Sequence, residues 1–284
     1  MSSATATAAP LTVPGATRWR LTPRSGIAVL SAEVRKGLTR QLANPVAHLV
    51  TLAFAAMMYL GMQYVIGAGT LQRDLLPPTL VGISSYWFLH FACIVMVSDL
   101  VEEKRSGTFA QAQLTPSPLW LVMLGRLLTA SVFGLVVSVT GTLVPMLVTG
   151  TTIPLEWAAL VPYALVVVNA LAFTLVMAAL ALNSPMVAVL EALLTSLVLL
   201  LNGAFMPLSL YPDWMAVLAR LLPTTLGVEA TAKTLLEGRS LGDIWNDGTL
   251  PWLLVYTAAL VLAGWALFVR NHRKALRDGR LGQY

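Results

Sequence analysis

Long apolar stretches alternate with short polar connections along most of this chain. A helix that crosses the hydrocarbon core of a bilayer needs about 20 mainly apolar residues, and about six stretches reach that length. They cover residues 46–66, 76–97, 119–148, 155–182, 186–207 and 250–269. The third and fourth are longer than one crossing requires, which indicates tilt or extension beyond the lipid. The pattern therefore predicts an all-α integral membrane protein with six transmembrane helices.

The residues before the first span form two segments. Residues 1–23 are rich in Ser, Thr, Ala and Pro and lack the basic start and apolar core of a cleavable signal, so we expect a disordered cytoplasmic tail. Within 24–43, apolar residues recur at helical spacing while Arg35, Lys36 and Arg40 occupy other faces. This spacing predicts an amphipathic helix in the membrane interface. The alternative is an N-terminal extension of the first span.

Composition supports the membrane assignment. Hydrophobic residues make up 57% of the 284 residues and charged residues only 11%, with a mean hydropathy of +0.76. A soluble chain so poor in charge could not cover its own surface. Cys93 is the only cysteine, which excludes a disulfide framework and a metal site built on cysteines.

Basic residues are distributed unevenly, and this predicts the topology. Six Lys or Arg lie within 18–40, three within 104–126 and five within 270–280. Positively charged connections tend to stay in the cytoplasm, so we expect both termini and the connection after the second span to lie there. The membrane domain would then cover 24–270, followed by a basic cytoplasmic tail at 271–284. Charge confined to the ends of a membrane bundle is not the pattern of a nucleic-acid binder.

The polar segment 100–118, between the second and third spans, is the most distinctive part of the chain. It combines charged residues with Gly107, which would permit close approach of another backbone, and the Thr-Pro-Ser-Pro run at 115–118, which would stop a helix sharply. This composition predicts a short helix over 102–113 that is exposed at the cytoplasmic face. The alternative is a solvated loop, since charge runs often form one.

Two motifs resemble the type-2 ABC transporter permeases. The first runs from Glu103 to Phe109, continues with Leu-Thr-Pro at 114–116 and ends with Leu-Gly-Arg at 124–126. The second, at 203–208, 211–214 and 221–225, is similar to the family's re-entrant segment before the last span. Arg105 departs from the acid that the family often carries, and Arg126 departs from its usual lysine. The resemblance implies a six-span permease in a bacterial cytoplasmic (inner) membrane.

The resemblance also implies the energy source and the partners of this chain. Two copies of a separate nucleotide-binding ATPase subunit would hold ATP and Mg, while a second permease copy would complete a homodimer within the membrane lipids. This chain has no phosphate-binding loop, HExxH zinc motif or Gly-x-Ser-x-Gly elbow, so we expect no enzymatic activity and no cofactor of its own. Glu103 aligns with the family's leading acid, and Glu102 is the alternative contact. The expected ATPase-coupling residues are Glu102, Glu103, Lys104, Arg105, Gly107, Thr108, Thr115 and Pro116.

Several residues within the spans are candidates for a pathway or gate. Ionisable groups in a membrane are costly, so Glu191 is a functional candidate by default, although a structural pair with Arg126 is an alternative. The aromatic residues could line a path for a bulky cargo or could face lipid. Asn202 precedes a glycine and could let its helix break. The full set is Tyr86, Trp87, Phe88, Glu191, Asn202, Phe205 and Pro207.

The connection 207–249 is too long for a simple turn and contains apolar helical patterns at 214–222 and 226–236. We expect helices that re-enter the outer leaflet, or else helices that lie on the outer surface. The expected function is export of a hydrophobic or amphipathic small molecule, such as a drug or antibiotic. Alternatives are export of a lipid or lipid-linked polysaccharide, ion-driven secondary transport, and a membrane-embedded enzyme.

Overall fold

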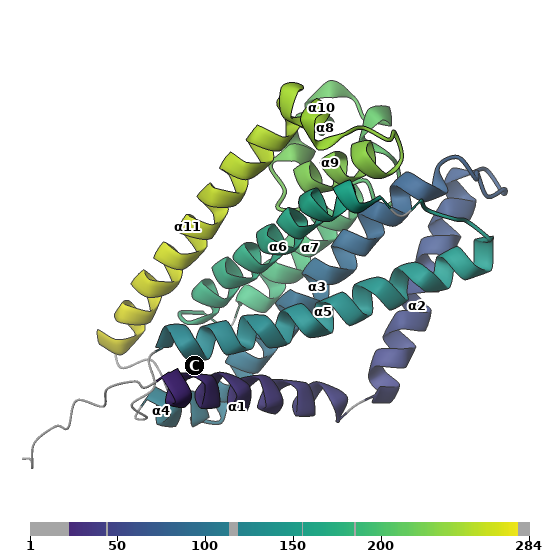
Figure 1. Cartoon of the computed structure of the whole chain (residues 1–284). Helices are drawn as coiled ribbons and strands as arrows, with labels where there is room; N and C mark the ends of the chain where they lie inside the picture. Colours follow the sequence, from purple (N-terminus) through teal and green to yellow (C-terminus); the bar gives the residue numbers. More distant parts are fainter. Residues whose placement is uncertain (1–22, 44, 114–118, 155, 185, 278–284) are drawn as a thin grey trace, which may run out of the picture.

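The computed structural model describes residues 23–43, 45–113, 119–154, 156–184 and 186–277. Within these ranges every regular element is a helix, as Figure 1 shows. The α-helices are α1 (Pro23–Leu42), α2 (Pro45–Ile66), α3 (Leu76–Arg105), α4 (Thr108–Gln113), α5 (Leu119–Thr149), α6 (Leu160–Ala181), α7 (Val187–Leu201), α8 (Asp213–Arg220), α9 (Thr225–Leu235), α10 (Leu241–Asn246) and α11 (Thr249–Arg277). Two short 3₁₀ helices are η1 (Trp157–Ala159) and η2 (Leu208–Leu210).

Five helices are long and apolar enough to cross a membrane: α2, α3, α5, α6 together with η1, and α11. The shorter apolar helix α7 has 15 residues. These six confirm the prediction of an all-α membrane protein with about six spans. The fifth helix is shorter than the expected 186–207, because the chain leaves helical geometry at Asn202 and Gly203 takes a φ of +90°. The last helix is longer than expected and includes half of the segment predicted as a basic tail.

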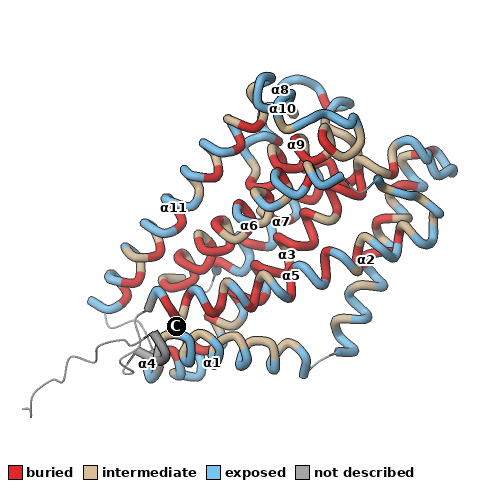
Figure 2. The backbone as a smooth tube through the Cα atoms, viewed as in Figure 1, coloured by how far each residue is buried: buried red, intermediate tan, exposed pale blue. Residues whose placement is uncertain are grey.

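Helix α3 lies at the centre of the bundle and packs against α5, α6 and α7. Figure 2 shows its buried residues as a nearly continuous red run, whereas α11 and α2 carry many exposed residues. The exposed side chains on α2 and α11 are largely apolar, for example Val65 and Leu262. Apolar side chains on the outside of long helices are what a bilayer solvates.

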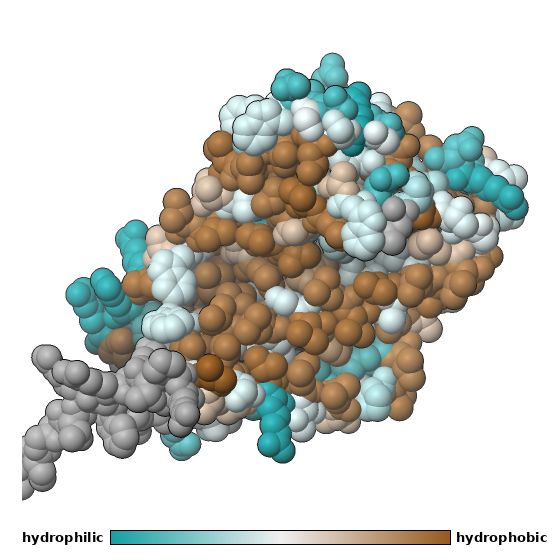
Figure 3. All heavy atoms as spheres, viewed as in Figure 1, coloured by the Kyte–Doolittle hydropathy of each residue, from teal (hydrophilic) through white to brown (hydrophobic). Residues whose placement is uncertain are grey.

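The two ends of the bundle have different structures. Helices α8, α9 and α10 cap one end, while α1 and α4 lie at the other (Figure 1). A broad hydrophobic surface separates the hydrophilic atoms at these two ends in Figure 3. Helix α1 covers most of the predicted segment 24–43 and packs along α5 instead of extending α2. The predicted N-terminal tail lies almost entirely outside the described residues.

Candidate functional site

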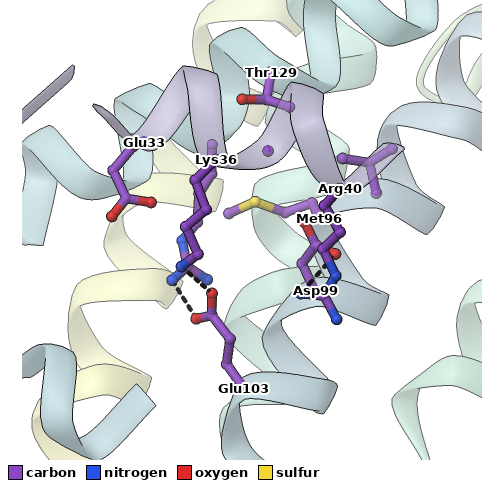
Figure 4. Close-up of a pocket in the computed structure, with 10 residues that line it drawn as sticks. Glu33, Lys36, Arg40, Met96, Asp99, Glu103 and Thr129 are labelled. Atoms are coloured by element: carbon purple, nitrogen blue, oxygen red, sulfur yellow. Dashed lines mark hydrogen bonds and ion pairs between the residues drawn. The ribbon is translucent and has the colours of Figure 1, made fainter. Parts of the chain in front are cut away.

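Glu103 lies where α1, α3 and α5 meet, at the α1 end of the bundle. Its side chain is only 8% exposed, and both carboxylate oxygens are paired. Lys36 Nζ of α1 lies 2.7 Å from Oε1, and Arg126 Nη2 of α5 donates to Oε2. Figure 4 shows these two interactions converging on the carboxylate. One acid of α3 therefore joins two other helices.

A second ion pair lies one turn away on the same helices. Arg40 Nη1 of α1 is 3.2 Å from Asp99 Oδ1 of α3 (Figure 4). Lys36 and Arg40 are four residues apart, as are Asp99 and Glu103, so each pair lies on one face of its helix. The two faces meet, and α1 is fixed to α3 by charge at two successive turns.

Two glycines bring α1 close to α5. A Cβ added to Gly37 would lie 2.5 Å from Thr129 Cγ2, and one added to Gly125 would lie 2.7 Å from Glu33 Cβ. Neither separation is possible for real side chains, so the contact depends on the missing Cβ atoms. This close approach brings Lys36 within reach of Glu103.

The polar segment after these contacts forms a turn. Helix α3 ends at Arg105, and the Ser106 backbone N–H donates to Glu102 O at 2.9 Å. Gly107 has a φ of +74°, a left-handed conformation that favours glycine, and α4 begins at Thr108. No heavy atom of the described residues lies within 4 Å of a Cβ added to Gly107, so no backbone among them makes the expected close approach. Within this chain, Gly107 serves the turn itself.

Helix α4 is attached to the bundle through Phe109 and Arg126. Phe109 is buried, and the Arg126 guanidinium carbon lies 5.8 Å from the centre of its ring. An arginine over an aromatic face is an attractive contact. Because the same guanidinium pairs with Glu103, α4 is linked to α3 and α5 through one side chain.

Lys104 connects this turn to a fourth helix. Its side chain is buried, and Nζ donates to Leu182 O at 2.7 Å, at the end of α6. A buried ammonium must be hydrogen-bonded to be tolerated. The end of α3 is thus connected to α1, α5 and α6 together.

The predicted coupling residues divide into two groups. Glu102, Arg105 and Thr108 are exposed, whereas Glu103 and Lys104 point into the bundle. An exposed helix over 102–113 is therefore wrong in detail, since the acids lie on the last turn of α3, and α4 starts only after Gly107. Neighbouring positions on a helix point about 100° apart, so Glu102 and Glu103 cannot share a face. Thr115 and Pro116 lie outside the described residues.

The sequence model of the ABC-2 type transporter family matches residues 26–236 of this chain. The chain belongs to this family. A comparison with curated proteins gave no match. The match includes α1, the α3–α4 turn and the helices up to α9, and it confirms the resemblance to type-2 ABC transporter permeases. Members of this family are generally transmembrane subunits whose ABC ATPase is a separate subunit.

Glu191 of this ABC-2 permease lies on α7 and is only 7% exposed. Its Oε1 has no hydrogen-bond partner among the described residues. The alternative that Glu191 pairs with Arg126 is wrong, because Arg126 binds Glu103 instead. Because Glu191 is a buried acid with one oxygen unpartnered among the described residues, it stays a candidate for a pathway role.

The aromatic candidates on α3 are buried within the permease. Tyr86, Trp87 and Phe88 are 7%, 5% and 0% exposed, so the alternative that they face lipid is wrong. Tyr86 stacks on His90 with ring centroids 5.3 Å apart, and the Trp87 and Phe91 rings lie tilted with centroids 6.0 Å apart. These rings form packed core within one chain, and their part in a pathway stays a prediction.

Asn202, the residue after α7, connects the end of this helix to α3 by hydrogen bonds. Its Nδ2 donates to Gly82 O and to Ser85 Oγ, each at 3.1 Å, and its Oδ1 accepts from the Ala204 N–H at 3.0 Å. A Cβ on Gly82 would lie 2.5 Å from the carbonyl carbon of Gly203, so the two backbones touch. The predicted break in the helix is present at Asn202. There the backbone after α7 crosses α3 and packs tightly against it.

Phe205 and Pro207 follow this crossing. Phe205 is buried, and its carbonyl accepts from Gln63 Nε2 of α2 at 3.1 Å. Pro207 precedes η2 and lines an open pocket of about 720 Å³ beside α9. Gln63 was not among the predicted residues, although a lone amide in an apolar span signals a buried hydrogen bond.

Lys36 and Arg40 were also missed as the partners of Glu103 and Asp99. The available signal was the matching four-residue spacing of opposite charges in α1 and α3, but spacing alone does not say which helices meet. Among the described residues, no group of three or more His, Cys, Asp or Glu is placed to hold a metal ion. The cluster around Glu103 connects α1, α3 and α5 through charge.

Proposed function

We propose that this chain is the permease subunit of an ATP-driven exporter that moves a hydrophobic or amphipathic small molecule out through a bacterial cytoplasmic membrane. Two such chains would form a homodimer and bind two ATPase subunits. The α1 and α4 end would face the cytoplasm, as the basic residues in that region favour. Family membership supports the permease role and an ATPase partner in general.

The observation that carries the proposal is the rigid connection of the α3–α4 turn. Its outer side presents Glu102, Arg105 and Thr108, which are exposed and accessible to another protein. Its inner side is tied through Glu103 to α1 and α5, and through Lys104 to α6. A partner that pushes on the outer side would move several helices as a unit, which is what coupling between two sites requires.

The cargo class is argued from the chemistry of the spans. Their side chains are mainly aliphatic, and the aromatic candidates lie together around α3. Such surroundings offer an apolar solute dispersion and hydrophobic contact but few hydrogen bonds. Glu191, with one carboxylate oxygen unpartnered among the described residues, would favour a cargo that also carries a polar or cationic group.

Co-purification and stimulated ATP hydrolysis test the proposal. The full-length chain should be extracted in mild detergent from its native membrane with a near-stoichiometric ATPase. Replacing both Glu102 and Arg105 with alanine should leave expression and thermal stability unchanged but reduce ATPase association and stimulation. The matched control is alanine at both Glu237 and Arg239, an exposed ion pair at the other end of the bundle. Equal ATPase binding and stimulation in the two double variants would contradict the coupling assignment.

A further inference from the structure

A groove runs between α8, α9 and α11 at the end of the bundle opposite α1. Its volume is about 620 Å³, and it opens on the outside of the chain. It is separate from the α3–α4 turn and shares no residue with the predicted pathway. The groove has a charged end and an apolar end, an arrangement that matches an amphiphile lying across a membrane interface.

The apolar end would lie in the bilayer. It is lined by Leu221 of the loop after α8, Leu226 of α9 and Val255 and Ala259 of α11. Leu221 and Val255 are 68% and 60% exposed, so a large apolar surface is left open here. Covering such surface with a hydrocarbon chain is favourable in water and costs nothing in lipid.

Aromatic side chains mark the depth of the membrane interface. Trp252 and Tyr256, one turn apart on α11, both line the groove. Trp252 is 66% exposed, and the Tyr256 hydroxyl donates to Leu221 O at 2.9 Å. Exposed Trp and Tyr concentrate at the level of lipid headgroups. The charged end of the groove lies beside the first turn of α11, and thus at or above that level.

The charged end is balanced. Arg220 Nε lies 3.1 Å from Glu229 Oε2, and Lys233 Nζ lies 3.1 Å from Asp247 Oδ2. All four side chains line the groove, giving two cations and two anions around one opening. A ligand with a single net charge would meet repulsion from half of this set. A ligand with one positive and one negative group can satisfy both halves.

We propose that this groove binds a zwitterionic phospholipid from the leaflet at the α8–α10 end. One acyl chain lies along Leu221, Leu226 and Val255. The phosphate faces Arg220 and Lys233, and the ammonium faces Glu229 and Asp247. The lipid would hold the short capping helices against α11, a role distinct from carrying cargo.

The test compares two neighbouring alanines in the full-length chain. Ala259 lines the groove and Ala258 does not, and both are exposed. Ala259→Trp should fill the apolar end, whereas Ala258→Trp places the same side chain on the lipid-facing surface beside it. Each protein is purified in mild detergent, equilibrated with equal amounts of phosphatidylethanolamine and phosphatidylglycerol, and weighed by native mass spectrometry.

Wild type and Ala258→Trp should retain phosphatidylethanolamine in preference to phosphatidylglycerol. Ala259→Trp should bind it about tenfold more weakly, equivalent to about 1.4 kcal/mol, because the indole displaces about two methylenes of the acyl chain from the groove. Equal retention by the two variants would overturn the site. Equal or better retention of phosphatidylglycerol by the wild type would overturn the zwitterionic assignment without needing any variant. A change in oligomeric state confined to Ala259→Trp would show instead that a second protein chain occupies the groove.

Discussion

The Glu103 carboxylate of α3 and the Arg126 guanidinium of α5 form a buried ion pair, with both side chains less than 10% exposed. These two charges are 23 positions apart in the sequence, and Lys36 of α1 binds the second carboxylate oxygen. Arg126 also covers the Phe109 ring. The pair therefore lies at the point where the α3–α4 turn joins the rest of the permease.

Removing one member of this pair should lower the stability of the folded protein strongly. We expect Glu103→Leu to lower stability by about 3–5 kcal/mol, because it leaves the Arg126 charge buried without its acid. The double variant Glu103→Leu/Arg126→Met should recover most of the loss, since no buried charge is left unpaired. Thermal unfolding of the purified protein in detergent measures both.

Lys36→Met provides the control for this prediction. The Lys36 side chain is 54% exposed, so its loss should cost no more than about 1 kcal/mol. A double variant as unstable as Glu103→Leu alone would show that the loss does not come from an unpaired Arg126 charge.

Gly37 should tolerate no side chain. A Cβ there would lie 2.5 Å from Thr129 Cγ2, so Gly37→Ala should push α1 away from α5 and lower the melting temperature. Adding Thr129→Ala should restore part of the loss, because it removes the two atoms that an added Cβ would meet first. Gly61→Ala is the matched control. Outside its own helix backbone, no heavy atom of the described residues lies within 4 Å of its added Cβ, and alanine favours helix by up to about 1 kcal/mol. Equal melting temperatures for Gly37→Ala and Gly61→Ala would contradict the close contact.

Asn202 should be needed for the packed crossing between α7 and α3. Asn202→Ala would leave the buried Ala204 N–H without its acceptor and should cost about 1–3 kcal/mol. Ser196→Ala, an exposed hydroxyl that bonds only within its own helix, should have little effect. Thermal unfolding compares the two variants. A stable Asn202→Ala protein would mean that the backbone contact at Gly82 alone holds this crossing.

Asp247 should make the stability of the folded protein depend on pH. The Thr249 hydroxyl and backbone N–H bind its carboxylate and lower its pKa from 3.8 to about 2. A lowered pKa stabilises the folded state above the unfolded value, and that contribution is lost as the pH falls through the folded value. The difference in melting temperature between wild type and Asp247→Asn should therefore be constant from neutral pH to about 4 and shrink between about 4 and 2.

The comparison with Asp247→Asn cancels the titration of the other carboxylates, which both proteins share. Asp213→Asn is the control, because Asp213 is an exposed acid in the same region. A change of the same size in both variants would mean that it does not come from the contacts of Thr249 with Asp247. A difference for Asp247→Asn that does not vary down to pH 2 would contradict the role of Thr249.

The spans and their main break follow from the sequence because they depend on local properties. The length of an apolar run decides whether a helix can cross a membrane. This placed α2, α3 and α5 within a few residues of their ends, apart from the polar extension of α3 to Arg105. The glycine after Asn202 marked the end of α7, since only glycine enters the left-handed region at little cost. The two motifs were sufficient to indicate the family.

Tertiary structure decided which polar groups meet. The sequence aligned Glu103 with the family's leading acid and left Glu102 as the alternative contact. In the structure Glu102 is exposed, whereas Glu103 is bound by Lys36 and Arg126. The sequence also left open a pair between Arg126 and Glu191, whereas in the structure Arg126 binds Glu103. A residue's neighbours along its own helix are fixed by a repeat of 3.6 residues, but its neighbours on other helices depend on how those helices pack. In this chain the close approach at Gly37 brings Lys36 to Glu103, and only the folded structure could show it.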